Sequence, residues 1–506
     1  MPEEKSEKKP EQDNTLTYKG NTTKHHITFA RSTRLAYTAI ADWVLLRKRE
    51  KPIARMFHVA YLADRRTAGR PITFVFNGGP GAASAYLHMG ALGPRRAVFH
   101  ADGTLQKPPT RLLNNRESWL RFTDLVFIDP IGTGFSRTID KKDTAPKKEG
   151  EKKEAESGEP KENTEFWELD RDLESLGEFI QKFLSKHHRW TAPVFIVGES
   201  YGGFRVAKLA RTLQESYGVG LNGAILISPV IEFASLLGSD YNLVHWIELF
   251  PSLAATAWVQ DRGYKPKNEI TLENYLKLAE TFSQNELLTL LGQGAAMDTR
   301  RRSRIFRQMA RLIGLSPDLV DRCAGRIDHY IFARELLRDQ RLYCGLYDAS
   351  LTAIDPFPDR NYYEGPDPTL AAIDRIFQAA INSQLRQTLG VDTELDYELL
   401  SYKVNRAWHS KHDASLFRGA IGAMDDLRYG MVLNPYMKVC IAHGYFDLVT
   451  PYFSSHRLIE LMKLDDTLRP NLSTQIYLGG HMFYTWEASR KAFAKSMELL
   501  YKEATT

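Results

Sequence analysis

A serine between glycines stands where the sequence changes from a strand pattern to a helix pattern. The run G-E-S-Y-G at 198–202 follows the apolar run P-V-F-I-V and precedes an amphipathic run that begins at Phe204. The spacing G-x-S-x-G in that context predicts a nucleophile elbow, a strained turn that presents the serine hydroxyl in a cleft. The following helix would direct amide donors toward a developing oxyanion. Ser200 is therefore the predicted nucleophile.

Two candidate partners for Ser200 follow apolar runs near the C-terminal end of the sequence. Asp447 comes after M-K-V-C-I-A-H-G-Y-F, and His481 comes directly after T-Q-I-Y-L-G-G. A serine hydroxyl is a weak nucleophile, so it needs a base and an acid that orients the base; with this elbow the chain order is serine, acid, histidine. Catalytic groups of open α/β sheets collect at the carboxyl ends of the strands. We therefore expect Ser200, Asp447 and His481 to form a catalytic triad.

A second glycine-rich loop could complete the site. The run F-N-G-G-P-G at 76–81 follows another apolar run and offers backbone amides with no side chains in the way. An oxyanion hole of this type takes one amide from the residue after the nucleophile and one from the loop after an earlier strand. Gly79 and Tyr201 are the predicted donors.

Apolar runs bounded by Gly or Pro recur along the chain and predict the elements that position these residues. They begin near residues 71, 123, 192, 223, 437 and 474. The runs are continuously apolar rather than alternating, which is typical of parallel strands buried on both faces. Helical patterns separate most of them, and two stretches before residue 71 look like antiparallel edge strands. We expect an α/β fold: a mostly parallel central sheet with helices on both faces.

The same patterns divide the chain into regions. Residues 140–163 contain no Val, Ile, Leu, Met or aromatic residue, which predicts a disordered charged loop, and residues 1–20 are predicted to be a disordered charged leader. From 232 to 420 the strand pattern gives way to helix-like sequence, so we expect an inserted, mainly helical cap. Residues 21–231 and 421–506 would form the two parts of the catalytic core.

The composition is that of an ordinary globular protein. The chain has 506 residues, 43% of them hydrophobic and 25% charged, with a net charge of +5, which gives little support for nucleic-acid binding. Three widely spaced cysteines fit no disulfide framework. No apolar run reaches about 18 residues, so we expect no membrane span. The charged N-terminal run lacks the apolar segment of a signal peptide, which predicts a cytoplasmic location, or a periplasmic or secreted one if a signal segment is missing.

We expect no cofactor and no metal. Gly132-Thr133-Gly134 lacks the third glycine of a dinucleotide-binding loop. His409 and His412 have no carboxylate or cysteine that completes a metal set. The oligomeric state cannot be read from the sequence, and a homodimer is one option.

Five motifs in the same order resemble those of the serine carboxypeptidase family. They are N-G-G-P-G-A-A-S, D-P-I-G-T-G-F-S, G-E-S-Y-G-G, H-G-Y-F-D-L-V-T-P and G-G-H-M-F-Y. The resemblance implies an α/β-hydrolase fold, peptide substrates and release of C-terminal residues through an acyl-enzyme on Ser200. It gives Asp447, His481, Gly79 and Tyr201 the roles expected above. It also implies that Asn77 and Glu199 hold the terminal carboxylate of the substrate.

Two departures from the family pattern stand near these residues. Ala82 replaces the cysteine that well-studied members carry after N-G-G-P-G, so the chain resembles a bacterial-type member without disulfides. The approach to Gly93 reads M-G-A-L, so the second carboxyl that usually pairs with that of the elbow glutamate is absent. Without that like charge, Glu199 should hold the substrate carboxylate more weakly or shift the pH optimum toward acid, unless burial or the arginines at 95 and 96 compensate.

Two other functions remain open at this point. The same Ser-Asp-His triad serves esterases and acyltransferases, since one fold supports several acyl-transfer reactions. A binding protein without catalysis is the third option, although a triad with two oxyanion loops argues against it.

Overall fold

A central sheet runs through the molecule and carries the residues singled out above. The computed structural model describes residues 19–29, 33–64, 69–139, 164–236, 238–264, 270–360, 362–411 and 421–506. Within them the sheet has ten strands in the order β1-β2-β3-β7-β4-β9-β10-β13-β14, with β8 (Arg137–Thr138) paired to β3. The strands are β1 (Asn21–Thr28), β2 (Arg34–Lys48), β3 (Lys51–Ala63), β4 (Ile72–Phe76), β7 (Asp124–Ile128), β9 (Val194–Glu199), β10 (Gly223–Ile227), β13 (Lys438–Gly444) and β14 (Leu472–Tyr477).

The direction of the strands follows the two sequence patterns. β7, β4, β9, β10, β13 and β14 are mutually parallel, whereas β1, β2 and β3 are antiparallel and join the sheet at β7. The predicted α/β fold is confirmed, including the antiparallel strands before residue 71. The carboxyl ends of β4, β9, β13 and β14 therefore lie along one edge of the sheet, where Gly79, Ser200, Asp447 and His481 follow.

Helices bury both faces of this sheet, as the continuously apolar strands predict. In β4, Phe74 and Phe76 belong to one apolar core and Val75 to the other. The first core includes α2 (Leu169–Lys186), α3 (Tyr201–Tyr217) and α12 (Met424–Leu433). The second includes α14 (Glu487–Thr505), which supplies Phe493 and Tyr501. Successive side chains of a strand point to opposite faces, so a strand between two helical layers has to be apolar at every position.

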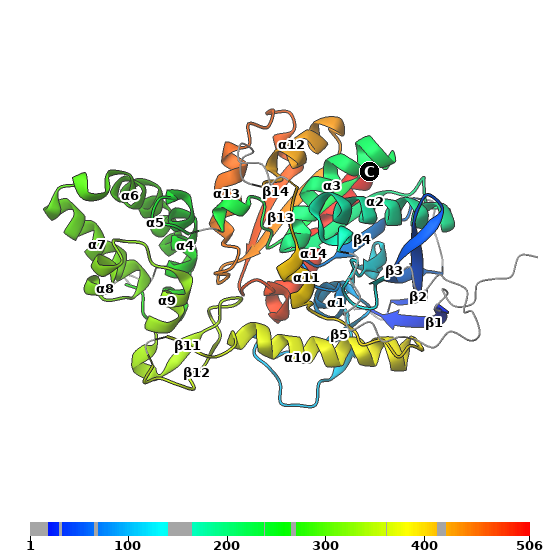
Figure 1. The fold of residues 1–506 in the computed structure, drawn as a ribbon, viewed down its shortest axis with the longest axis horizontal. Coiled ribbons are helices and arrows are strands. Elements are labelled where there is room, and N and C mark those ends of the chain that lie inside the picture. The colour runs from blue at the N-terminus through cyan, green and yellow to red at the C-terminus, as the bar shows by residue number, and fades with distance from the viewer. Residues whose placement is uncertain are drawn as a thin grey trace, which may run out of the picture.

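Between β10 and β13 the chain forms a separate helical lobe and a long helix. We call α4–α9 the cap lobe: α4 (Leu243–Val259), α5 (Leu272–Phe282), α6 (Leu288–Gln293), α7 (Thr299–Ile313), α8 (Pro317–Arg322) and α9 (His329–Glu335). It lies to the left in Figure 1, and its apolar core is distinct from the two that flank the sheet, although Phe446, Leu448, Tyr452 and Phe453 of the sheet domain also belong to it. A short hairpin that the sequence pattern does not predict follows, made of β11 (Leu342–Cys344) and β12 (Thr352–Ile354).

The rest of this insertion packs on the sheet domain. Helix α10 (Pro368–Asn382) runs along it below α1 (Ala85–Leu87) in Figure 1 and contributes Ile373, Phe377 and Ile381 to the core. α11 (Tyr402–Ala407) follows, and α13 (Tyr452–Leu461) connects β13 to β14. Segments near residue 400 therefore lie beside the loop after β4, which the bridge between Ala82 and Leu400 shows.

Two of the expected regions lie wholly or largely outside the part of the chain that the structure describes. The charged loop 140–163 and residues 1–18 of the leader lie outside the described residues. Cys323, Cys344 and Cys440 are all free, as their spacing predicts. In the described part of the chain, no helix combines the length and apolar character that crossing a bilayer requires.

Candidate active site

Ser200 occupies the turn between β9 and α3. Its backbone has φ of 60° and ψ of −124°, a region that residues other than glycine rarely adopt. The Ser200 amide donates to the carbonyl of Ile227 in the neighbouring strand at 2.9 Å, and its carbonyl accepts from the amide of Gly203 at 2.9 Å. These bonds fix the strained turn, so that Ser200 lines a small pocket together with His481.

Asp447 and His481 meet beside this pocket, although 33 residues and a helix separate them along the chain. The His481 Nδ1 lies 2.7 Å from the Asp447 Oδ2, and both side chains are fully buried. Asp447 Oδ1 accepts from the amides of Val449 and Thr450 at 2.8 and 2.9 Å, which holds the carboxylate in place. Burial opposes the charged imidazolium, but the Asp447 carboxylate outweighs it, so the pKa of His481 is raised. With Nδ1 toward Asp447, Nε2 is free to act as the base.

Thr450 is a further member of this group that the sequence reasoning missed. Its hydroxyl lies 2.7 Å from Asp447 Oδ2, 3.0 Å from His481 Nδ1 and 2.9 Å from the carbonyl of Ser228. Ser228 in turn donates its own hydroxyl to the carbonyl of His481 at 2.8 Å. The spacing D-x-x-T, in which a threonine follows an acidic turn residue, is the signal that could have indicated it.

The glycine loop after β4 lies directly against the elbow. A Cβ at Gly78 would come within 2.5 Å of the Tyr201 nitrogen and 2.8 Å of the Gly202 nitrogen, so only glycine allows this approach. Tyr201 is the first residue of α3, and the amides of a first helical turn have no partner within their helix. Gly79 lines the same pocket as Ser200. The two predicted oxyanion donors therefore come from segments that are in contact.

Glu199 and Asn77 also line this pocket, and a third residue joins them. The Asn77 Nδ2 donates to Glu199 Oε2, and the Tyr484 hydroxyl lies 2.9 Å from both carboxylate oxygens of Glu199. Asn77 is itself oriented because its Oδ1 accepts from the amide of Leu87 at 3.1 Å. We call Asn77, Glu199 and Tyr484 the carboxylate clamp, after the substrate-binding role proposed for them below. The sequence predicted the first two; Tyr484 is the last residue of the G-G-H-M-F-Y motif, but no role was predicted for it.

Burial changes the expectation for the acidity of Glu199. Because the second carboxyl of the family pattern is missing, we expected no neighbouring negative charge to raise the pKa of Glu199. Desolvation nevertheless raises the pKa of Glu199 to about 7, against the lowering effects of His481, Tyr484 and Asn77. The arginines at 95 and 96 do not supply this shift: Arg95 bonds the Thr388 hydroxyl, and Arg96 donates to the carbonyl of Ala97. Burial is therefore the compensating factor.

A buried ion pair between Asp172 and Arg205 contacts Asn77 of the clamp. The Arg205 Nε lies 2.8 Å from Asp172 Oδ2, and both side chains are almost completely buried. Arg205 also donates to the carbonyl of Asn77 at 2.7 Å, while the Tyr201 hydroxyl donates to Asp172 at 3.1 Å. The Asn77 loop and the first turn of α3 are thus attached to one charged pair.

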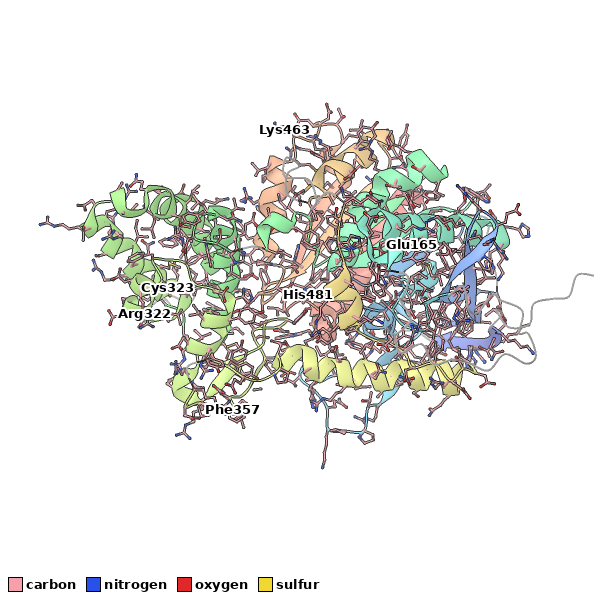
Figure 2. The ribbon with its side chains drawn as sticks, in the orientation of Figure 1. Glu165, Arg322, Cys323, Phe357, Lys463 and His481 are labelled. Carbon is pink, nitrogen blue, oxygen red and sulfur yellow. The ribbon has the colours of Figure 1, made fainter. Side chains whose placement is uncertain are left out.

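Residues of the insertion between β10 and β13 contact the loop after β14 that carries His481, which we call the histidine loop. The amide of His481 donates to the carbonyl of Tyr347, whose ring packs edge-on against the imidazole at 5.3 Å. Asp348 accepts from the Gly480 amide and the Trp486 indole, each at 3.0 Å. In Figure 2 His481 lies near the middle of the molecule, with Arg322 and Cys323 far out on the cap lobe. Both parts of the chain therefore contribute to the site.

The arrangement has the parts that acyl transfer requires. It combines a strained serine, a buried histidine hydrogen-bonded to a carboxylate, and a glycine loop that packs against the first turn of the helix after the serine. No group of three or more His, Cys, Asp or Glu side chains suited to a metal occurs in the described residues.

The sequence of the chain is similar to those of known serine carboxypeptidase-like proteins. A sequence model of the family described as "Serine carboxypeptidase" matches residues 39–476. Serine carboxypeptidase-like 5 of Arabidopsis thaliana is 26% identical over 254 residues, which is 46% of this chain and 50% of that protein. Serine carboxypeptidase-like 13 of the same plant is 25% identical over 238 residues, or 45% of this chain and 46% of that protein. The chain thus spans about half the length of the curated relatives it matches.

Solved structures resemble the chain more remotely. A proline iminopeptidase from Mycobacterium smegmatis aligns with 96% of this chain and 99% of its own, at 10% identity and a TM-score of 0.36. A monoglyceride lipase variant from Saccharomyces cerevisiae aligns with 92% of this chain and 95% of its own, at 11% identity and a TM-score of 0.35. The family match, by contrast, extends along most of the sequence and includes Ser200 and Asp447. The chain therefore belongs to the serine carboxypeptidase family.

Proposed function

We propose that this chain is a serine carboxypeptidase in which Ser200, Asp447 and His481 are the catalytic triad. His481 Nε2 takes the proton from the Ser200 hydroxyl as its oxygen attacks the scissile carbonyl. The resulting oxyanion accepts hydrogen bonds from the amides of Gly79 and Tyr201. The C–N bond then breaks, and His481 gives the proton to the departing amine. Water, deprotonated by His481, hydrolyses the acyl-enzyme and returns Ser200 to its hydroxyl form.

One observation carries the carboxypeptidase assignment: the carboxylate clamp opens into the same pocket as the nucleophile. Glu199 lies one residue before Ser200, is buried, and has a pKa of about 7, so a large fraction of it is protonated at neutral pH. A protonated Glu199 can donate a hydrogen bond to the carboxylate of a substrate, which an ionised glutamate would repel. An ordinary esterase has no need of such a group beside its serine.

A pair of blocked dipeptides tests this function. Each carries the same acyl residue, and the two differ only in a free C-terminal carboxylate or a C-terminal amide. We expect kcat/KM at pH 6 to favour the free acid by at least about tenfold, the effect of one hydrogen bond to a charged group. Both activities should be lost in Ser200→Ala. Equal rates on the two peptides would contradict the carboxypeptidase assignment.

Esterase or acyltransferase activity on the same triad is the second candidate. It is favoured by Ala91, which leaves the clamp with one carboxyl instead of two. Hydrolysis of simple esters without hydrolysis of any peptide, or product formed only when an alcohol acceptor is added, would support it.

We also propose that residues 232–420 act as one insertion in a core made of 21–231 and 421–506. This division is supported by Tyr347 and Asp348, through which the insertion contacts the histidine loop. Its functional consequence is that the insertion completes the pocket around Ser200, to which it contributes Tyr347, Leu370 and Leu400.

A further inference from the structure

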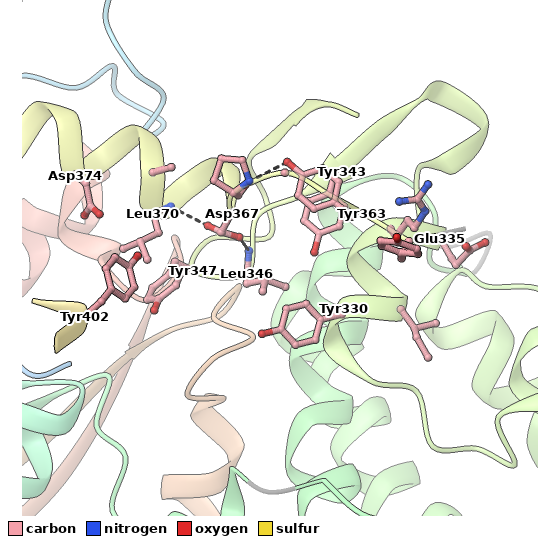
Figure 3. Close-up of a pocket in the computed structure, with 16 residues that line it drawn as sticks. Tyr330, Glu335, Tyr343, Leu346, Tyr347, Tyr363, Asp367, Leu370, Asp374 and Tyr402 are labelled. Carbon is pink, nitrogen blue, oxygen red and sulfur yellow. Dashed lines mark hydrogen bonds between the residues drawn. The ribbon is translucent and has the colours of Figure 1, made fainter. Parts of the chain in front are cut away.

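A second, larger pocket adjoins the catalytic pocket. It has a volume of about 650 Å³, whereas the catalytic pocket has about 60 Å³, enough for only a few water molecules. Tyr347 and Leu370 line both, so the two are neighbours along one wall (Figure 3). A substrate side chain that does not fit beside Ser200 therefore has space to extend here.

The walls of the larger pocket are unusually rich in tyrosine. Its aromatic lining consists of Tyr330, Tyr343, Tyr347, Tyr362, Tyr363 and Tyr402. Figure 3 shows Tyr347 and Tyr402 together at the end near Asp374, while Tyr343 and Tyr363 lie further along. The last two are stacked with centroids 3.8 Å apart. Faces of tyrosine rings attract cations, above all the planar guanidinium group.

The charges that line this pocket are predominantly negative. Three acidic residues line it, Glu335, Asp367 and Asp374, and one basic residue, Arg334. The positive charge of Arg334 is balanced by the carboxylate of Asp355, which lies 3.3 Å from its guanidinium. Glu335 is likewise paired, with Arg338. Among the described residues no Lys or Arg lies at ion-pair distance from Asp367 or Asp374. Two carboxylates therefore have no cation of the protein beside them.

These two carboxylates differ in what holds them. Asp367 caps α10, since its Oδ1 accepts from the amides of Thr369 and Leu370, and its Oδ2 accepts from the amide of Leu346. Asp374 accepts one hydrogen bond, from the Tyr86 hydroxyl at 2.8 Å, and burial raises its pKa. Asp374 is thus a half-buried carboxyl bonded to Tyr86, and Tyr86 lines the catalytic pocket.

The contacts of α10 place the larger pocket on the side of the carboxylate clamp. One turn after Asp374, Phe377 packs against Tyr86 with ring centroids 5.3 Å apart. A Cβ at Gly90 would meet Tyr484 of the clamp at 2.6 Å and Phe377 at 3.1 Å. In the proposed mechanism the clamp binds the residue that leaves. A side chain of that residue that extended past Tyr347 and Leu370 would enter the larger pocket.

We propose that this pocket receives the side chain of the released C-terminal residue and selects arginine and lysine. The inference rests on the proposed carboxypeptidase function and names its substrate class. A cationic side chain would pass Tyr347 and Leu370, lie against tyrosine rings, and meet the carboxylate of Asp374. An acidic side chain would bring a third negative charge to Asp367 and Asp374 and would be rejected.

A series of blocked dipeptides tests the preference. All carry the same acyl residue, and their C-terminal residues are Arg, Lys, Leu and Glu. We expect kcat/KM for Arg and Lys to exceed that for Leu by about tenfold or more, with Glu the poorest substrate. Cleavage with Leu or Glu equal to or better than Arg would overturn the inference and leave the carboxypeptidase function standing. Cleavage of none of the four would overturn both.

An asparagine variant identifies the group responsible. Asp374→Asn keeps an acceptor for the Tyr86 hydroxyl but removes the charge, so the ratio of Arg to Leu activity should fall about tenfold. A far-UV circular dichroism spectrum that matches that of the unaltered chain shows that the variant is folded. Asp392→Asn, an exposed carboxyl beyond the end of α10, is the matched control and should leave the ratio unchanged.

Inhibition by free amino acids gives a second measurement that does not depend on turnover of different substrates. Free L-arginine should inhibit cleavage of the Leu peptide more strongly than free L-leucine, and Asp374→Asn should abolish the difference. An unchanged ratio and unchanged inhibition in Asp374→Asn would overturn the role of this carboxyl.

Discussion

The hydroxyl of Tyr484 lies 2.9 Å from each carboxylate oxygen of Glu199, in a fully buried environment. The tyrosine ring occupies space left by Gly90, because a Cβ there would come within 2.6 Å of the ring. The next residue, Ala91, has no carboxyl to offer. A phenol thus binds Glu199 in a chain whose sequence lacks the second acid of the family pattern. Unlike a second carboxyl, it stabilises the ionised form of Glu199.

Replacing Tyr484 by phenylalanine should move the pH dependence of peptide cleavage. The Tyr484 hydroxyl donates to the Glu199 carboxylate and lowers its pKa, so its loss should raise that pKa further above 7. The alkaline decline of kcat/KM on a free-acid dipeptide should shift upward by about one to two pH units, the equivalent of one hydrogen bond to a charged group. A shift of the decline toward acid would contradict the role of the Tyr484 hydroxyl in lowering the pKa of Glu199. An unshifted decline would show that a group other than Glu199 causes it.

Glu199 itself should give the cleavage of free acids an alkaline limb. Protonated Glu199 predominates well below pH 7 and declines as the pH rises through about 7. His481, whose pKa is raised by the Asp447 carboxylate, must lose its proton before it can act as a base. We therefore expect a bell-shaped profile of kcat/KM for the free-acid peptide. The corresponding C-terminal amide should show only the ascending limb.

The variant Glu199→Gln separates these two titrations. A glutamine still accepts from Asn77 and Tyr484 and can donate its amide to the substrate carboxylate, but it does not ionise. Activity on the free acid should then rise with pH and reach a plateau. A bell that persists in Glu199→Gln would assign the alkaline limb to another group.

The sequence predicted the sheet and the residues at the ends of its strands because those features depend on local patterns. Apolar runs predict buried strands, glycines predict tight turns, and chain order predicts that Asp447 and His481 meet after β13 and β14. Their 2.7 Å contact agrees with that placement. The roles of these residues, and those of Gly79, Tyr201 and Asn77, remain predictions until variants are measured.

The contact between Tyr484 and Glu199 and the existence of the tyrosine pocket could not be predicted in this way, for a physical reason. Tyr484 reaches Glu199 only because Gly90, far away in the sequence, leaves room for its ring. The larger pocket forms where α9, the β11–β12 hairpin and α10 converge, and no local pattern specifies how three segments of an insertion pack. The effect of burial on Glu199 is likewise a property of the assembled site.

Asp447→Asn should reduce kcat severely while leaving substrate binding nearly intact. Asp447 accepts from His481 Nδ1 and thereby holds the tautomer in which Nε2 can take the serine proton. An asparagine that donates toward Nδ1 favours the wrong tautomer, and in serine proteases the comparable change costs about 10⁴-fold in kcat. Steady-state kinetics on the free-acid dipeptide give the test. A kcat within tenfold of the original would exclude Asp447 as the orienting acid.

Thr450→Val should have a smaller effect on the same step. The hydroxyl contacts both Asp447 Oδ2 and His481 Nδ1, so its removal loosens the pair without removing a charge. We expect kcat to fall about tenfold, the effect of one hydrogen bond, with KM unchanged. Thr450→Ser restores the hydroxyl and should recover most of the activity. Failure of serine to rescue would show that the methyl group, and hence packing, is what matters.

Breaking the buried pair of Asp172 and Arg205 should destabilise the fold around the site. Asp172→Asn leaves the Arg205 guanidinium buried without its carboxylate, and such a loss typically costs about 3–5 kcal/mol. The thermal unfolding midpoint should fall by several degrees. Glu487→Gln, which removes a largely exposed pair with Lys491, is the control and should cost no more than about 1 kcal/mol.

Since Arg205 donates to the carbonyl of Asn77, Asp172→Asn should also raise KM for the free acid more than for the amide. Equal changes in KM for both peptides would confine the pair to a structural role.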